Sequence, residues 1–296
     1  PEVMDRTTLP IYVLVTPAHN EEATIGATIE SVVAQTVLPR KWVIVSDGST
    51  DGTDDIVRRY AHEHDWIEFV RVREHRDRQF AAKVEAFNAG YNRLNGEEYD
   101  IIGNLDADIT FGPDYFQYLL GKFQTVSALG VGGTPFEEDG HSYDYRFTNV
   151  EHVSGACQLF RRRCFEEIGG YQPIRGGGID WVAVTTARML GWRTQTFTDK
   201  VSHHHRKMGT GNAGALGSLF RHGKKDYTLG GHPLWQLARV FYQMSRKPYI
   251  VGGILLGAGY SWAWMRGSKR PIADELVSFH RGEQLRRLRK KVLGTK

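Results

Sequence analysis

The sequence predicts an α/β fold in which helices flank a mostly parallel central sheet, with a helical, partly apolar extension at the C-terminus. Two observations lead to this prediction. Along the first two thirds of the chain, short apolar runs alternate with segments whose apolar residues recur at helical spacing, which is typical of parallel strands joined by helices. In the last third, residues 248–265 form one uncharged, largely apolar segment that is followed by a basic tail.

In the first half of the chain, expected strands alternate with expected helices. An apolar run at 11–16 precedes a helical pattern formed by Ile25, Ile29, Val32 and Val33. Further strands are expected at 42–45, 67–72 and 100–105, and further helices around 56–60 and 81–93. Ligands of open α/β sheets bind beyond the carboxyl ends of the strands, so polar residues that directly follow these runs are candidates for a site.

The second half is less regular. An aromatic-rich helix is expected after Pro113, and a helix over 181–190 should end at Gly191, a common stop residue. Strands are expected at 128–134 and 153–160, on either side of a polar loop around 137–145.

The composition is that of a folded globular protein. The chain has 296 residues, of which 41% are hydrophobic, enough for one large α/β domain with an appendage, and we expect the division at 1–215 and 216–296. Cys157 and Cys164 are too few for a disulfide framework and fit a reducing compartment. No apolar signal run precedes Ile11, so we expect a cytoplasmic location.

The C-terminal third carries the basic charge. Residues 266–296 hold ten Lys or Arg against three Asp or Glu, although the net charge of the whole chain is only +4. Basic residues also precede the apolar segment 248–265, whose length lies at the lower limit for a membrane span. We therefore expect residues 248–296 to contact a membrane surface, at the inner face of the plasma membrane, and expect no nucleic acid partner. A helix packed on the domain, or on a second copy in a homodimer, fits the segment equally.

Residues 46–53, SDGSTDGT, form the first candidate site. They follow a predicted strand and open a predicted helix, so Asp47 lies where its carboxylate can accept an imide N–H from a nucleobase. An EF-hand loop that begins at Asp47 is excluded, because its twelfth residue is Arg58 rather than Glu. An Asx turn with Asp51 as the helix cap is an alternative for the loop.

Asp106 and Asp108 form the second candidate site, in the triplet DAD directly after the run 100–105. Two carboxylates separated by one residue can converge on one hard cation, Mg²⁺ or Mn²⁺, and a diphosphate would complete its shell. Such an ion neutralises negative charge that develops on a leaving diphosphate. Asp pairs of this spacing also occur in ordinary turns.

Residues 202–207, SHHHRK, form the third candidate site. Its histidines and cations could supply one more metal ligand and a diphosphate clamp. In an extended segment His203 and His205 point one way and His204 the other, so one or two of them reach the site. We choose His203, with His205 as the second choice. A surface basic cluster, or an anion site without metal, is the alternative.

Four ordered motifs resemble those of family 2 glycosyltransferases. They are TPAHNEE at 16–22, VSDGSTDGT at 45–53, Lys83 with NAG at 88–90, and DAD at 106–108. The resemblance covers roughly residues 10–210. It implies a GT-A, Rossmann-like fold, a nucleoside-diphosphate sugar donor, a divalent metal and inversion of stereochemistry at the transferred sugar.

The resemblance also implies roles for individual residues. The donor contacts Pro17, Ala18, Glu21, Asp47, Lys83, Asp106 and Ala107, with Glu21 on the ribose hydroxyls and Asp47 on the base. Asp106, Asp108 and His203 bind the metal, Asp108 directly. One departure follows the triplet, where Ile109 stands in place of the third Asp of many relatives.

Family members place their catalytic base in a Glu-Asp pair before a helix that ends in Gly-Trp-Arg. Here Asp180 precedes a predicted helix and the sequence GWR at 191–193, so the resemblance implies Asp180 as the base that takes the acceptor's proton. Ile179 replaces the usual Glu and leaves this carboxylate without a like-charged neighbour. The alternative is that Asp180 caps the helix that begins at Trp181.

The predicted function is an inverting, metal-dependent glycosyltransferase. A saccharide or lipid-linked saccharide acceptor would place it in cell-surface polysaccharide or glycolipid assembly. The alternatives are a nucleotidyltransferase and a catalytically silent nucleotide-sugar-binding or membrane scaffold protein. A Rossmann dehydrogenase is excluded because no GxGxxG follows the first strand, and the lack of a QxxRW segment argues against a processive polymer synthase.

Overall fold

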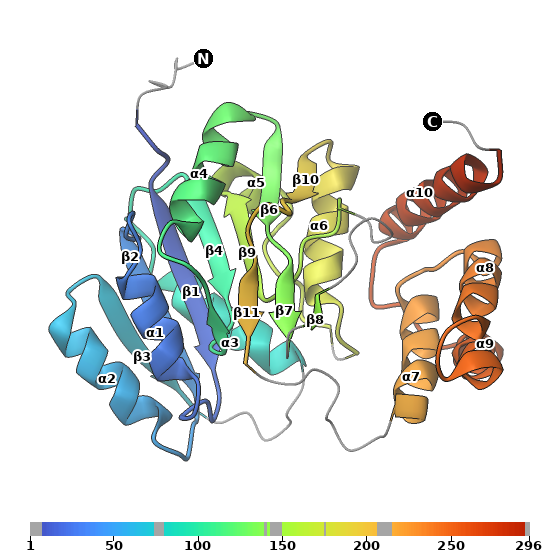
Figure 1. Ribbon diagram of the computed structural model, residues 1–296, viewed down its shortest axis with the longest axis horizontal. Helices are drawn as coiled ribbons and strands as arrows, with labels where there is room; N and C mark the ends of the chain where they lie inside the picture. The colour runs from blue at the N-terminus through green and yellow to red at the C-terminus, as the bar shows by residue number, and fades with distance from the viewer. Residues whose placement is uncertain are drawn as a thin grey trace. The chain divides into compact units, whose positions relative to one another are not determined.

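The computed structural model describes residues 8–73, 80–138, 141–142, 150–174, 176–205 and 215–293. The chain divides into two compact units, Pro1–Lys207 and Met208–Lys296. The first unit contains the strands, and the described part of the second is helical (Figure 1). Within the described residues, no helix has both the length and the hydropathy that crossing a membrane requires.

A seven-stranded sheet forms the centre of the first unit, with the strand order β10-β6-β9-β4-β1-β2-β3 (Figure 1). Its strands are β1 (Tyr12–Ala18), β2 (Lys41–Asp47), β3 (Ile67–Val72), β4 (Ile101–Leu105), β6 (Leu129–Gly133), β9 (Cys157–Arg161) and β10 (Arg193–Thr196). They run parallel except for β9, which is antiparallel to its neighbours β4 and β6. The prediction of a mostly parallel sheet is confirmed.

The direction of β9 follows from where the chain enters it. Cys157, its first residue, pairs with Leu105, the last residue of β4, so β9 starts at the edge where β4 ends. The N-terminal strands are instead joined by helices that return the chain to the opposite edge. The apolar run predicted this strand but not its direction, and the strand begins at Cys157 rather than at residue 153.

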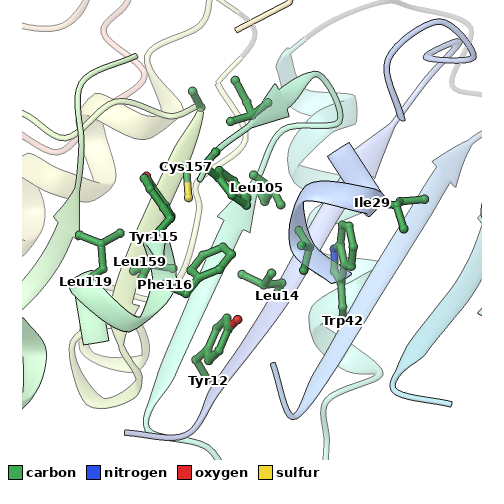
Figure 2. Close-up of a cluster of buried hydrophobic side chains, with 14 of the residues drawn as sticks. Tyr12, Leu14, Ile29, Trp42, Leu105, Tyr115, Phe116, Leu119, Cys157 and Leu159 are labelled. Carbon is green, nitrogen blue, oxygen red and sulfur yellow. The ribbon is translucent and has the colours of Figure 1, made fainter. Parts of the chain in front are cut away.

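Helices cover both faces of the sheet, which is why its strands are continuous apolar runs. On β1, Tyr12 and Leu14 belong to one core, shown in Figure 2, and Val13 and Val15 belong to the other. The first core lies under α1 (Ile25–Val33), α2 (Thr53–Glu63) and α4 (Tyr115–Thr125), and the second under α3 (Phe80–Asn92), α5 (Arg162–Glu167) and α6 (Ile179–Met189). The predicted stop of α6 is confirmed by Gly191, whose φ is 90°.

A small second sheet, in the order β5-β11-β7-β8, corrects the expectation for residues 137–145. Its strands are β5 (Ile109–Thr110), β11 (Ser202–His204), β7 (Phe136–Glu138) and β8 (His141–Ser142). A polar loop was expected where β7 and β8 pair as an antiparallel hairpin, and residues 143–149 lie outside the described residues. Two- and three-residue strands contain no period-2 pattern to recognise.

Gly90, in the NAG motif, allows α3 to lie close on the sheet. A Cβ atom at this position would lie 2.6 Å from Val15 Cγ1 and 2.8 Å from Val45 Cγ2. Gly121 in α4 is its natural control, because a Cβ there would meet nothing within 4 Å. Alanine substitutions at these two positions therefore distinguish the effect of helix propensity on stability from the effect of core packing.

We expect Gly121→Ala to stabilise the protein by roughly 0.5–1 kcal/mol, since Ala is the better helix former. Gly90→Ala gains the same propensity but overpacks the core at a cost of roughly 1–3 kcal/mol. Chemical denaturation should therefore find Gly90→Ala the less stable variant by about that packing cost. Equal stability of the two variants would show that the sheet yields to the added methyl group.

The second unit contains four helices in its described part, α7 (Ala215–Thr228), α8 (Pro233–Met244), α9 (Tyr249–Met265) and α10 (Asp274–Leu293). The predicted apolar segment 248–265 corresponds to α9, which packs against both α7 and α8. Glycines allow the close approach, since a Cβ on Gly223 or Gly259 would collide with the backbone of the facing helix. Tyr260 Oη donates a hydrogen bond to the Gly231 carbonyl oxygen at 2.8 Å.

Candidate active site

Three parallel strands of the large sheet end side by side at its carboxyl edge. Ala18 ends β1, Asp47 ends β2 and Asp106 follows β4, with β1 between the other two strands. In the register, Ala18 lies opposite Ser46, and Val15 lies opposite Asn104. The strand order therefore brings together the predicted donor residues Pro17, Ala18, Asp47, Asp106 and Ala107.

Hydrogen bonds tie the loops after β1 and β2 into one framework. The Asn20 N–H donates to Ser49 Oγ at 3.1 Å, and the Thr50 N–H donates to Asn20 Oδ1 at 2.8 Å. Glu22 Oε2 accepts the Gly52 N–H at 3.0 Å. Asn20 has a φ of 55°, a left-handed conformation that Asn adopts more readily than most residues. The motifs TPAHNEE and SDGSTDGT are therefore two halves of one structure.

Asp51 belongs to that framework rather than to a ligand site. Its Oδ1 accepts the Thr53 N–H at 3.1 Å, and its Oδ2 accepts the Glu22 N–H at 3.1 Å. The first of these bonds makes an Asx turn, while the N-cap position of α2 is held by Gly52. Burial would raise the pKa of Asp51, but its hydrogen bonds with Thr53 and Glu22 lower that pKa below its usual value.

Lys83 and Asp106 form an ion pair at the same edge, with Nζ 2.5 Å from Oδ1. Burial would lower the pKa of Lys83, but the negative charges of Asp106, Asp180 and Asp108 hold it above its usual value. One lysine from α3 is thus within electrostatic reach of three carboxylates, two beyond β4 and one on α6. Four residues predicted from three separate motifs therefore lie within electrostatic reach of one another.

Asp108 is buried, and its Oδ2 lies 3.4 Å from His204 Nε2. Strand pairing brings the imidazole there, because His204 lies opposite Ile109 and the His205 N–H donates to the Asp108 carbonyl oxygen at 3.0 Å. The hydrogen bond with Asp108 raises the pKa of His204. No sequence motif distinguished His204 from its two neighbours.

His203, the ligand chosen from the sequence, lies on the other side of β11. Its Nδ1 is 3.8 Å from Glu137 Oε2, and 54% of its side chain is exposed. His205 Nε2 shares a hydrogen bond with Thr110 Oγ1 at 2.8 Å. The alternation expected of an extended segment is present, but the face that meets Asp108 is that of His204. Residues 206 and 207, the predicted diphosphate clamp, lie outside the described residues.

The donor atoms around Asp108 suit a divalent cation. A carboxylate oxygen and an imidazole nitrogen already lie 3.4 Å apart, and Mn²⁺ accepts both. His204 Nδ1 is buried and makes no hydrogen bond within the described residues. No group of three or more His, Cys, Asp or Glu side chains in that part of the chain is arranged as a metal site. A diphosphate would have to complete the coordination shell.

Asp180 lies in the first turn of α6. The N-cap is Gly178, with a φ of 99° and no side-chain capping bond, so Asp180 does not cap this helix and the capping alternative is wrong. A Cβ at Gly155 would lie 3.0 Å from Asp180 Cβ, so the segment before β9 approaches the carboxylate closely. His152 Nε2 lies 4.0 Å from Asp180 Oδ2, a neighbour that no motif indicated.

Comparison with known proteins finds a family similar to the first half of the chain. The family model described as "Glycosyl transferase family 2" matches residues 13–150, which include both interlocked loops, Lys83 and the DAD triplet. Residues 13–150, the larger part of the first unit, are therefore similar to family 2 glycosyltransferases. The resemblance of the four motifs to family 2 glycosyltransferases is confirmed.

Glycosyltransferases also lead the curated relatives. Glycosyltransferase AglE of Haloferax volcanii is 26% identical over 265 residues, which cover 79% of this chain and 77% of that protein. The probable glycosyltransferase YdaM of Bacillus subtilis is 26% identical over 55% of this chain and 43% of its own length. The poly-beta-1,6-N-acetyl-D-glucosamine synthase of Staphylococcus aureus is 29% identical over 46% of this chain, but this chain spans only 31% of the synthase.

Solved structures of other glycosyltransferases share the fold. Mannosyltransferase PcManGT from Pyrobaculum calidifontis, in complex with GDP-Man and Mn²⁺, has a TM-score of 0.57 at 19% identity and covers 95% of this chain and 81% of its own. TarS residues 1–349 from S. aureus, in complex with UDP-GlcNAc, has a TM-score of 0.56 at 14% identity, with coverages of 87% and 74%. The predicted GT-A fold is confirmed.

Proposed function

We propose that this glycosyltransferase is metal-dependent and inverting, and that it moves a sugar from a nucleoside-diphosphate donor to an acceptor hydroxyl. The observation that carries the proposal is the gathering of Lys83, Asp106, Asp108 and Asp180. Sugar transfer requires positive charge beside the departing diphosphate and a carboxylate that takes the acceptor's proton. Both kinds of group are present within electrostatic reach of one another.

The nucleoside of the donor binds against the interlocked loops. Asp47 accepts an N–H from the base, and Glu21 holds the ribose hydroxyls, while Pro17, Ala18 and Ala107 line the nucleotide. The low exposure of Asp47, 9%, supports its role, because a hydrogen bond to a buried carboxylate competes little with water. Uracil and guanine both offer such an N–H, as in the UDP-GlcNAc and GDP-Man bound by TarS and PcManGT.

Lys83 and the metal ligands face the diphosphate. Lys83 Nζ holds the Asp106 carboxylate in place and contributes positive charge of its own. Asp108 and His204 would hold Mg²⁺ or Mn²⁺, with Asp106 beside them, and His203 as a ligand stays a prediction from the sequence. A divalent cation bound there supplies Lewis-acid stabilisation of the leaving diphosphate.

Asp180 takes the proton of the acceptor hydroxyl as that oxygen attacks the anomeric carbon. The new C–O bond forms on the face opposite the bond to the diphosphate, so the configuration inverts and no sugar–enzyme intermediate forms. Two features support the assignment. Asp180 is not used as a helix cap, and its side chain is 36% exposed, which leaves it accessible to an acceptor.

We propose a saccharide or lipid-linked saccharide as the acceptor, in cell-surface polysaccharide or glycolipid assembly at the inner face of the plasma membrane. The support is twofold. One curated relative is a polysaccharide synthase, and the C-terminal residues 266–296 are strongly basic, which suits the anionic surface at which lipid-linked substrates are found.

The donor site is tested with the purified protein and a panel of UDP-, GDP- and dTDP-sugars, with and without Mn²⁺. We expect one donor to raise the melting temperature and to yield free nucleoside diphosphate. Asp47→Asn should weaken that donor's binding about tenfold or more, because an amide N–H₂ meets the N–H of the base. Asp65→Asn, at an exposed site after α2, is the control. Release of a nucleotidyl adduct instead would indicate a nucleotidyltransferase.

A further inference from the structure

The exposed apolar side chains of this protein are concentrated on two helices. Of the sixteen large hydrophobic side chains that are exposed in the described part of the chain, eleven belong to α8 and α9. Large exposed apolar patches mark binding surfaces more often than chance. The α8–α9 apolar face is defined here by Leu237, Phe241, Ile250, Ile254, Trp264 and Met265, whose exposures run from 53% to 72%.

Helix α9 has most of its large side chains on the outside. Ile250, Ile254 and Met265 lie on one side at helical spacing and are exposed, and the buried side is formed by Gly252, Gly253, Leu256, Gly259, Tyr260 and Ala263. A helix that packs on a water-soluble core shows the reverse arrangement, with its large apolar residues inside. The outward side chains of α9 therefore need an apolar environment that the described helices of the second unit do not provide.

The glycines of α9 prevent the helix from turning its outward side chains toward α7 and α8. A Cβ on Gly259 would collide with the Phe220 carbonyl oxygen of α7, and a Cβ on Gly253 would lie 2.6 Å from the Val240 carbonyl oxygen of α8. The backbones of these helices are thus too close for α9 to turn its isoleucines and tryptophans inward. The exposure of the apolar face is a consequence of the packing of the unit.

The charged residues in the sequence around the apolar face are all basic. Between Asp226 and Asp274 the sequence contains six Lys or Arg and no Asp or Glu. Two of the arginines stack on aromatic rings near the ends of α9, with the guanidinium carbon of Arg246 4.7 Å from the centre of Tyr242 and that of Arg266 4.6 Å from that of Trp262. Aromatic rings and basic groups around an apolar surface suit the headgroup region of a membrane.

We infer that the α8–α9 apolar face docks in the surface of an anionic lipid bilayer. The helices lie in the plane of the interface, their apolar side chains enter the acyl boundary, and the basic residues contact lipid phosphates. A second copy of this chain fits the face less well, because a twofold contact would bring the two basic rims together without acidic partners. The inference adds α8 to the surface that the sequence indicated, and it does not depend on the transferase activity.

The test is cosedimentation of the full chain with phosphatidylcholine vesicles that contain or lack phosphatidylglycerol. Wild-type protein should bind the anionic vesicles and lose affinity as salt is raised. Ile254→Glu and Phe241→Glu should each weaken partitioning about tenfold or more, since each replaces buried apolar surface with a charge. Leu190→Glu, at a leucine of the first unit that is 47% exposed, is the matched control and should bind like wild type.

A charge-reversed double variant, Arg246→Glu with Lys247→Glu, should lose the preference for phosphatidylglycerol. Wild-type helix content by circular dichroism shows that the second unit of each variant is folded, and donor-induced stabilisation of the first unit separates this inference from the proposed function. Equal vesicle binding by Ile254→Glu and wild type would overturn the inference. So would a wild-type dimer that ignores vesicles and that Ile254→Glu dissociates in ultracentrifugation, because the face would then be a self-association surface.

Discussion

Asp180→Asn should lower kcat roughly 10²- to 10⁴-fold, the range that loss of a general base produces. The amide keeps the size of the side chain but cannot take the acceptor's proton. Affinity for the donor should be little changed, because the proposed donor contacts lie on the loops after β1 and β2 and on the DAD triplet. Initial rates with saturating acceptor, together with donor titration by calorimetry, measure the two quantities separately.

Asp55→Asn is the matched control for that substitution. Asp55 lies in the first turn of α2, as Asp180 lies in the first turn of α6, so each change removes a negative charge near a helix N-terminus. The shared effect on stability is roughly 0.3–1 kcal/mol, and only Asp180→Asn should affect turnover. Near-wild-type kcat in Asp180→Asn would remove this residue from the mechanism, and parallel loss of donor binding would make its role one of binding.

The sheet could be predicted from the sequence because both of its faces are buried. Residues such as Val13 and Leu14 point to opposite cores, so the central strands appear as uninterrupted apolar runs between helical patterns. The short strands β5, β7, β8 and β11 contain two or three residues each. They exist through pairing between distant segments, and no local pattern can indicate that.

The residues of the candidate site also divide into those that a local sequence pattern predicts and those that it does not. Asp47 and Asp106 were predictable because their position depends on one local fact, the end of an apolar strand. The choice among three adjacent histidines depends on the register of β11 against β5, where His204 lies opposite Ile109. The position of His152 beside Asp180 likewise depends on the packing of two segments 28 residues apart in the sequence. Long-range register of this kind is absent from a single sequence.

In the C-terminal unit, the sequence predicts the helix but not which of its faces is buried. An uncharged segment with glycines at 253 and 257 indicated a helix, and its apolar character indicated burial or contact with lipid. Which of its faces is buried depends on the closeness of α7 and α8, since Gly223 and Gly259 admit backbone contact. Close packing through glycine therefore leaves most of the large side chains of α9 on the outside, opposite to what hydrophobicity alone would suggest.

Asp108→Asn should lower turnover at saturating Mn²⁺ by about 10²-fold or more, since the Lewis-acid contribution of a bound cation is several kcal/mol. Asn keeps the side chain's volume and can still bond to His204, so the fold around this buried position should persist. Turnover as a function of Mn²⁺ concentration is the measurement. A variant with wild-type metal dependence would show that the triplet does not hold the cation.

The neighbouring histidines then identify the third donor. In the structure His204 Nε2 lies beside Asp108, whereas His203 lies beside Glu137. His204→Ala should therefore raise the Mn²⁺ concentration for half-maximal turnover about tenfold or more, while His203→Ala leaves it near the wild-type value. The two variants remove the same group from adjacent positions of one strand, so each controls for the other. The reverse outcome would restore the ligand predicted from the sequence and would require β11 to change its register against β5 when donor and metal bind.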